Sequence, residues 1–275
     1  MTKQKIYEIL YVICFIFFLI SIIYILAYLF FMYKDENDIE RIQSIMSENV
    51  NTIIEKEIIN NSESNTLENN IVTNEEINVY IDTEILNFKE IKKENSNIVA
   101  WIKIDGTKIN YPVLQGKDND YYLNKNYKNK YSRSGSIFLD YRYDFSKNNQ
   151  NLLIYGHNNR DDMMFNGLLQ YEKEDFYKEH SKIKIITEEE NKNYEIIAVF
   201  KSQVYRVDDK DVFRYYNYID LSDEKIFNEY ITKSKEKSLY NIDITPNYGD
   251  EIITLSTCEY SKENGRFVVV AVREK

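Results

Sequence analysis

The chain has 275 residues and carries 35 Lys and Arg against 45 Asp and Glu, so its formal net charge is −10 at pH 7. This acidic balance argues against a nucleic-acid partner, because such a protein needs a basic face. The length suffices for one membrane anchor and one globular domain of roughly 150–200 residues.

The N-terminal part of the chain predicts a membrane anchor. Ile9–Met32 is a run of 24 uncharged, mostly apolar residues, and about 20 such residues span a bilayer as a helix. Lys3 and Lys5 precede the run and Asp35 and Glu36 follow it, which places the N-terminus in the cytoplasm and the remainder outside. A cleaved signal peptide is the alternative, but the run is long for one and no small-residue cleavage site follows it.

Three segments are expected along the chain. Residues 1–33 form a cytoplasmic tip and a single transmembrane anchor, residues 34–77 form an extracytoplasmic stalk, and residues 78–275 form a globular domain. The stalk is rich in Asn, Glu, Ser and Ile and contains no Gly or Pro. Apolar residues at helical spacing predict an amphipathic helix over Asp38–Ile59.

Within the globular domain, the hydrophobic pattern predicts one helix followed by many short strands. The expected helices are Tyr80–Glu94, Met164–Tyr171, Asp175–His180 and Ser222–Ser234. The expected strands are Ile98–Ile104, Ile109–Leu114, Ser136–Asp140, Asn151–Tyr155, Lys182–Thr187, Tyr194–Tyr205, Glu251–Cys258 and Arg266–Arg273. Ser222 is the expected N-cap of the last helix, and Ile226 is one of its expected core residues. Short strands with peripheral helices predict a mostly β fold (α+β), a closed or nearly closed β-barrel of about eight strands.

Cys258 is the only cysteine outside the apolar N-terminal run, and it closes a predicted strand. A lone thiol in a domain outside the cell cannot form an intramolecular disulfide, so it is either a small buried apolar residue or a nucleophile. Seven residues separate it from Arg266. If they form a hairpin loop, the two residues become cross-strand neighbours, and the guanidinium can favour a thiolate and stabilise an oxyanion.

A cysteine nucleophile also needs a proton partner, and the chain has only two histidines. His157 follows a buried-type strand that ends in Gly156, and catalytic groups commonly lie at such strand ends. His180 ends a charged helical stretch and is expected to interact with the helix C-terminus. A structural role is the alternative for His157, as is a surface charge for Arg266, but the three residues together favour a catalytic site.

These residues resemble the sortase family, the membrane-anchored cysteine transpeptidases of Gram-positive surfaces. Thr254–Cys258 matches the TLxTC strand of the family, Gly265–Val269 its arginine strand and Ile154–Asn158 its histidine segment. The order His, Cys, Arg also matches, whereas papain-like peptidases place Cys before His. The resemblance covers roughly residues 78–275, and the TLxTC motif with its downstream Arg is highly specific.

The resemblance is to class B, because a long insertion with a helix lies between Tyr205 and Glu251. No aspartate-aromatic lid motif lies upstream, which argues against the pilus-polymerising class. There is also no convincing acidic calcium site, so neither a metal nor a cofactor is expected.

The resemblance implies a mechanism. Cys258 as thiolate attacks the carbonyl of a threonine in the C-terminal sorting signal of a surface protein, and Arg266 holds the substrate and the developing oxyanion. His157 as imidazolium protonates the departing amine. An amine of a peptidoglycan precursor then resolves the thioester, which attaches the surface protein to the cell wall by ping-pong catalysis.

By analogy with class B grooves, five further residues are expected to line the substrate site: Ser256, Glu259, Tyr155, Asn119 and Leu123. Ser256 shares the strand face of the nucleophile. For Asn119 and Leu123, packing is at least as good an interpretation.

No Asp or Glu is evidently placed to orient His157, so the histidine is expected to be held by backbone or only weakly, which predicts a slow enzyme. Two alternatives to a wall-anchoring sortase stay open. One is a pilus-building or hydrolytic sortase. The other is a membrane-tethered module that binds sorting signals without turnover.

Overall fold

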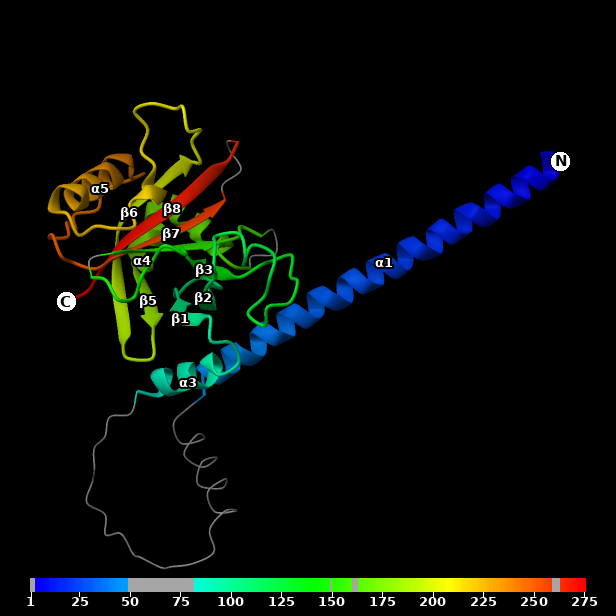
Figure 1. Cartoon of the computed structure of the whole chain (residues 1–275), viewed down its shortest axis with the longest axis horizontal. Helices are drawn as coiled ribbons and strands as arrows, with labels where there is room; N and C mark the ends of the chain where they lie inside the picture. The colour runs from blue at the N-terminus through cyan, green and yellow to red at the C-terminus, as the bar shows by residue number, and fades with distance from the viewer. Residues whose placement is uncertain (1–2, 49–81, 149, 160–162, 259–262) are drawn as a thin grey trace, which may run out of the picture. The chain divides into compact units, whose positions relative to one another are not determined.

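The computed structural model (Figure 1) describes residues 3–48, 82–148, 150–159, 163–258 and 263–275. The chain divides into two compact units, residues 1–42 and residues 43–275. Helix α1 (Lys3–Met46) is the one described helix that is long and apolar enough to cross a membrane. The helix predicted over Asp38–Ile59 is confirmed for residues 38–46, which form the last turns of α1 and bury Ile39, Ile42 and Met46, but residues 47 and 48 are not helical. The rest of that prediction, and the boundary at residue 77, lie outside the described residues.

The second unit is built on a closed barrel, as the sequence analysis predicted. Its strands follow one another around the barrel in the order β1-β2-β3-β4-β7-β8-β6-β5. The β2–β3 and β4–β7 pairs are parallel, and the remaining pairs are antiparallel. The strands are β1 (Ile98–Lys103), β2 (Asn110–Gln115), β3 (Ile137–Leu139), β4 (Asn151–Gly156), β5 (Lys182–Ile186), β6 (Asn191–Gln203), β7 (Ile252–Cys258) and β8 (Gly265–Arg273).

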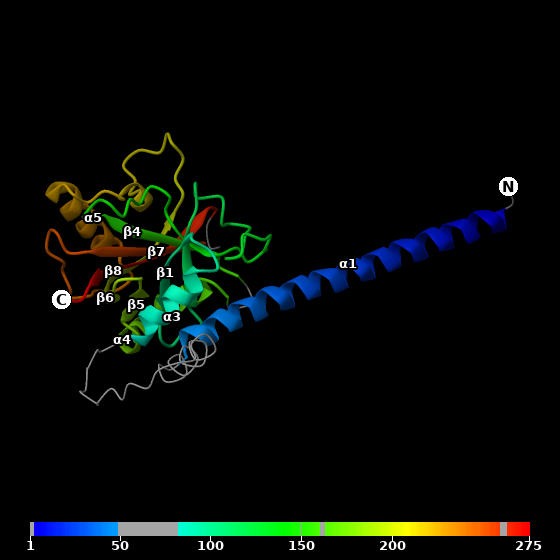
Figure 2. The same ribbon diagram turned by 60° about the horizontal axis from the view of Figure 1, so that its bottom comes forward.

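Short helices lie between the strands, and one precedes them. They are α3 (Thr83–Lys92), η1 (Asn166–Glu172), α4 (Glu174–Glu179), η2 (Tyr215–Asn217) and α5 (Glu224–Lys237). Helix α3 begins where the Asp82 side chain accepts hydrogen bonds from the first-turn N–H groups. Its Phe88 and Ile91 are fully buried, and it lies against β1 and β5 (Figure 2). On the same helix, Asn87 Nδ2 donates to the carbonyl of Met46 at 3.2 Å, which fixes the point where α1 ends.

Helix α5 differs from the prediction at its first turn. Its N-cap is Asp223, whose carboxylate accepts from the N–H of Ile226 at 3.0 Å, whereas the N–H of Ser222 is bound by Asp220. Ile226 is 41% exposed, because the face that packs on the barrel begins one residue later, at Phe227. One residue turns a helix by about 100°, which carries Ile226 off that face.

The outer face of the barrel beside α5 carries the strand positions that matter for function. Ile252 packs in one cluster with α5 side chains, so alternation places Thr254, Ser256 and Cys258 on the same face. The Thr254 hydroxyl bonds to Tyr230 of α5. Ile252, Thr254 and Ser256 are buried, but Cys258 is only partly buried. The burial of this face therefore decreases toward the end of β7, at Cys258.

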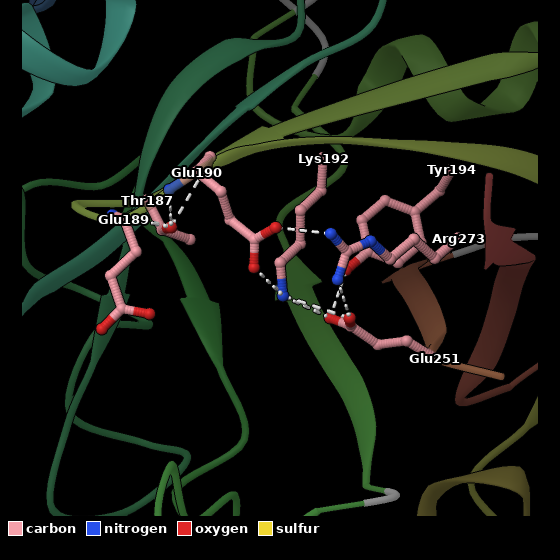
Figure 3. Close-up of polar contacts among 7 residues, drawn as sticks. All are labelled: Thr187, Glu189, Glu190, Lys192, Tyr194, Glu251 and Arg273. Carbon is pink, nitrogen blue, oxygen red and sulfur yellow. Dashed lines mark hydrogen bonds and ion pairs between the residues drawn. The ribbon is translucent and has the colours of Figure 1, made fainter. Parts of the chain in front are cut away.

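The opposite end of β7 and β8 is tied together by a charge cluster (Figure 3). Glu251 accepts from Lys192 Nζ at 2.9 Å, from the Tyr194 hydroxyl and from Arg273 Nη1 at 3.1 Å. Arg273 also pairs with Glu190. Burial alone would raise the pKa of Glu251, but these hydrogen bonds and positive charges hold it below its ordinary value.

Candidate active site

Three neighbouring strand ends bring the predicted catalytic residues together. Cys258 pairs directly with Arg266 in the antiparallel β7–β8 ladder, which confirms the cross-strand pairing expected from the loop length. On the other side of β7, the parallel β4 ends with Gly156 paired to Thr257. His157 follows Gly156, so the register places it beside Cys258. Neighbouring strands lie about 4.8 Å apart, and the histidine and the arginine therefore flank the thiol from opposite sides.

A hydrogen bond fastens the histidine segment to the cysteine strand. Asn158 Nδ2 donates to the carbonyl oxygen of Cys258 at 2.9 Å, and Asn166 Nδ2 donates to Asn158 Oδ1 at 2.7 Å. Asn158 is 7% exposed. The sequence analysis used Asn158 only as part of a motif and missed this role. Its position next to His157 was the available signal.

The ring of His157 is held by backbone. Its Nε2 lies 2.7 Å from the carbonyl oxygen of Leu123. A carbonyl can only accept, so Nε2 carries a proton and Nδ1 is left for proton exchange. Gly135 packs against this pair with a positive φ of 60°, and a Cβ there would lie 2.5 Å from the Leu123 oxygen and 2.9 Å from the His157 ring. A backbone group thus holds the ring, which is one of the two outcomes expected for this histidine.

Arg266 is the cross-strand neighbour of Cys258, so its side chain leaves β8 on the same face of the sheet as the thiol. Nη1 donates to the carbonyl of Gly265 at 2.9 Å and to that of Asn264 at 3.3 Å, and the residue is half-buried. Burial raises the pKa of Tyr215, and the hydrogen bond with Ser256 and the positive charge of Arg266 partly offset that rise. An arginine with this geometry can donate its other N–H groups to an oxyanion formed at Cys258.

The predicted groove residues have protein partners of their own. Ser256 is 1% exposed and shares a hydrogen bond of 2.7 Å with the Tyr215 hydroxyl. Tyr155 and Asn119 both donate to the carboxylate of Asp140, at 3.1 and 2.9 Å. These three side chains support the walls of the site, and their contact with substrate stays a prediction.

Leu123 and Glu259 are the other two residues predicted to line the groove. Leu123 is half-buried, and its main-chain oxygen contacts the ring of His157. Glu259 lies outside the described residues. His180 forms the C-cap of α4 and stacks on Phe176 with ring centroids 4.6 Å apart, consistent with a structural role. Within the described ranges, no group of three or more His, Cys, Asp or Glu residues could hold a metal ion.

A partly buried cysteine flanked by a histidine and an arginine, at the end of a closed β-barrel, defines an enzyme with a thiol nucleophile. The sequence model of the sortase domain matches residues 102–274. The chain is 40% identical over 190 residues to Sortase B of Staphylococcus aureus. The aligned region covers 67% of this chain and 73% of that protein. The chain is 39% identical over 183 residues to Sortase B of Listeria monocytogenes, covering 66% and 71%.

Solved structures that resemble this chain are also class B sortases. The Staphylococcus aureus sortase B–substrate complex matches with a TM-score of 0.66 and 29% identity, covering 88% of this chain and 97% of that one. Clostridium perfringens sortase B matches with a TM-score of 0.60 and 34% identity, covering 68% and 99%. The chain belongs to the sortase family, with class B enzymes as its relatives, and is a sortase cysteine transpeptidase.

Proposed function

We propose that this sortase attaches surface proteins to the cell wall. It cleaves a C-terminal sorting signal after a threonine and transfers the protein, through a thioester, to an amine of the peptidoglycan precursor. The observation that carries this proposal is the row of His157, Cys258 and Arg266 at three adjacent strand ends. The match to the Staphylococcus aureus sortase B–substrate complex supports the binding of a sortase substrate by this chain.

In the first half-reaction, the Cys258 thiolate attacks the threonyl carbonyl carbon. The carbonyl π electrons move to oxygen, and the N–H groups of Arg266 stabilise the oxyanion. When the tetrahedral intermediate collapses, the C–N bond breaks and the amine needs a proton. Because Nε2 of His157 is engaged by the Leu123 carbonyl, Nδ1 is the nitrogen that delivers this proton.

The second half-reaction reverses these roles. Neutral His157 accepts a proton at Nδ1 from the incoming amine, whose nitrogen attacks the thioester carbonyl. The intermediate again places negative charge beside Arg266 and then expels the Cys258 thiolate. The two half-reactions share one site, so the kinetics are ping-pong.

The membrane is the proposed location of the enzyme. The apolar part of α1 serves as its single span, with the N-terminus in the cytoplasm by the positive-inside rule. The catalytic unit then faces the wall, where the sorting signals and the precursor amines are found.

The test uses the full chain in detergent with a peptide that bears a sorting signal, with and without a glycine-based amine. We expect cleavage after the threonine, a mass increase on Cys258 from the acyl-enzyme, and a ligated product when the amine is present. Cys258→Ala should abolish all three, while the matched control Cys14→Ala, a substitution in α1, should abolish none. Turnover by Cys258→Ala would refute the proposal.

The same experiment separates the alternatives. Cleavage without ligation at any amine concentration indicates a hydrolytic sortase, and ligation to a lysine-bearing pilin segment indicates a pilus-building one. Peptide binding with neither an acyl-enzyme nor alkylation of Cys258 indicates a binding module.

A further inference from the structure

Asp140, directly after β3, carries a fully buried carboxylate that collects hydrogen bonds from three parts of the chain. The donors are the Arg142 backbone N–H at 3.0 Å, Arg142 Nε at 2.8 Å, Arg142 Nη2 at 2.7 Å, Asn119 Nδ2 at 2.9 Å and the Tyr155 hydroxyl at 3.1 Å. Burial alone would raise the pKa of Asp140, but the hydrogen bonds from Arg142 and Asn119 hold it below its ordinary value. The group is therefore an anion at neutral pH.

Arg142 extends this connection to a fourth segment. Its Nη2 also donates to the carbonyl oxygen of Tyr216 in η2 at 2.7 Å. The Tyr216 hydroxyl in turn accepts from the N–H of Tyr205 at 3.1 Å. One guanidinium thus ties the segment between β6 and α5 to Asp140 at the end of β3.

Each segment that meets this ion pair leads to the active site. Asn119 belongs to the connection that carries Leu123, whose carbonyl binds His157. Tyr155 lies two residues before His157 on β4 and pairs with Ser256 of β7.

The η2 contact reaches the same strand. Tyr215, the neighbour of Tyr216, bonds to the Ser256 hydroxyl. The Asp140 carboxylate therefore lies where the Asn119–Leu123 connection, the η2 segment and the histidine strand converge.

Stability alone does not account for a charged pair at this place. Removing a carboxylate from water costs several kcal/mol, and buried ion pairs are often no more stabilising than apolar residues of the same size. What a charged pair with fixed donors provides is a defined geometry. Here the hydrogen bonds from three segments end on two oxygens, so moving one segment disturbs the others.

We propose that Asp140 and Arg142 form a positioning pair for transpeptidation. They hold the Asn119–Leu123 connection and the η2 segment at a fixed separation, and so determine how tightly the groove between them binds the sorting signal. The inference rests on the proposed function for the identity of that ligand. Neither residue touches the reacting atoms.

Arg142→Lys tests the pair with little change in charge or volume. A lysine ammonium can reach one carboxylate oxygen but cannot bridge both oxygens of Asp140 and the Tyr216 carbonyl together. For the full chain in detergent, we expect KM for a sorting-signal peptide to rise about tenfold, the size expected for one lost charge-assisted hydrogen bond. The alkylation rate of Cys258 should stay within about twofold, because the thiol itself is not displaced.

Arg273→Lys is the matched control. Arg273 also binds a carboxylate, is equally exposed at 37%, and lies at the other end of β8 in the charge cluster of Figure 3. A purely structural role for Arg142 would lower stability and the fraction of active enzyme in both variants and leave KM unchanged in both. That result would overturn the inference.

Hydrogen–deuterium exchange separates this inference from the proposed function. If wild-type enzyme turns over no sorting-signal peptide, the proposed substrate is wrong, but the pair is still tested. Arg142→Lys should then accelerate exchange in residues 116–124 and 214–218, whereas Arg273→Lys should not. Unchanged exchange in both segments would refute the positioning role, and Asp140→Asn should reproduce the effect of Arg142→Lys where that variant folds.

Discussion

Gly135→Ala is the substitution that most directly tests how His157 is held. Gly135 has a φ of 60°, a region that L side chains rarely adopt. An added Cβ would lie 2.5 Å from the Leu123 oxygen, 2.8 Å from the Tyr122 oxygen and 2.9 Å from the His157 ring. Two of these three contacts are with the partners in the hydrogen bond that holds the His157 ring, so both partners must move.

The expected cost has two parts. An alanine at positive φ lowers the free energy of unfolding by about 1–2 kcal/mol, which corresponds to a fall in Tm of roughly 2–8 °C for a domain of this size. The Leu123 oxygen must also retreat by about 0.5 Å or more, because Cβ contacts under 3.0 Å are essentially never found. A misplacement approaching 1 Å near reacting groups costs about 100-fold in rate, and we expect kcat/KM to fall by about that factor.

Gly249→Ala is the control, since Gly249 also has a positive φ, 93°, but has no atom within 4 Å of an added Cβ. In thermal denaturation, both variants should lose the stability that an alanine at positive φ costs, and Gly135→Ala should lose more because its Cβ also meets backbone atoms. Only Gly135→Ala should lose activity against a fluorogenic sorting-signal peptide once rates are corrected for folded enzyme. Equal kcat/KM values in the two variants would refute the reasoning that this backbone contact orients the histidine.

Three further outcomes follow from named contacts. Ser256→Ala leaves the buried Tyr215 hydroxyl without its partner and should lower the free energy of unfolding by about 1–3 kcal/mol in urea titrations; a change below about 0.5 kcal/mol would contradict this. Asn158→Ala removes the bond to the Cys258 carbonyl and should lower kcat about tenfold in steady-state assays, and unchanged kcat would argue against this tether. The pKa of Glu251 is lowered from 4.5, so its stabilisation is present above about pH 4.5 and is lost as pH falls through the folded value. Glu251→Gln should weaken the fall in the free energy of unfolding, measured by urea titration, as the pH drops below about 4.5. An unaltered slope would show that other carboxylates dominate the acid sensitivity of the fold.

Much of the barrel could be predicted because it depends on local pattern. The β7–β8 hairpin is the best example. A short loop joins its strands, and alternation fixes which residues share a face, so the Cys258–Arg266 pair followed from the sequence. The parallel pairing of β4 with β7 did not follow, because about a hundred residues separate the paired positions and no turn geometry sets their register. The proximity of His157 to Cys258 could therefore be stated only from the fold or from the family resemblance.

The errors have equally local causes. Ser222 and Asp223 are adjacent, and either can cap a helix; the structure uses Asp223, while the N–H of Ser222 is bound by Asp220. Ile226 was expected to face the core, but the buried face of the helix begins one residue later, at Phe227.

The positioning of the histidine could not be predicted from residue types, because the group that performs it is a main-chain carbonyl. Any residue at position 123 would offer the same oxygen, so the identity of Leu123 carries no information about this role. The sequence does carry one sign of this role, the glycine at position 135, because a side chain on Gly135 would collide with the Leu123 oxygen. The expectation that backbone holds His157 rested on the lack of an evidently placed Asp or Glu, and it did not say which carbonyl would serve. A neutral carbonyl can only accept, so it fixes which nitrogen of His157 carries the proton and orients the imidazole.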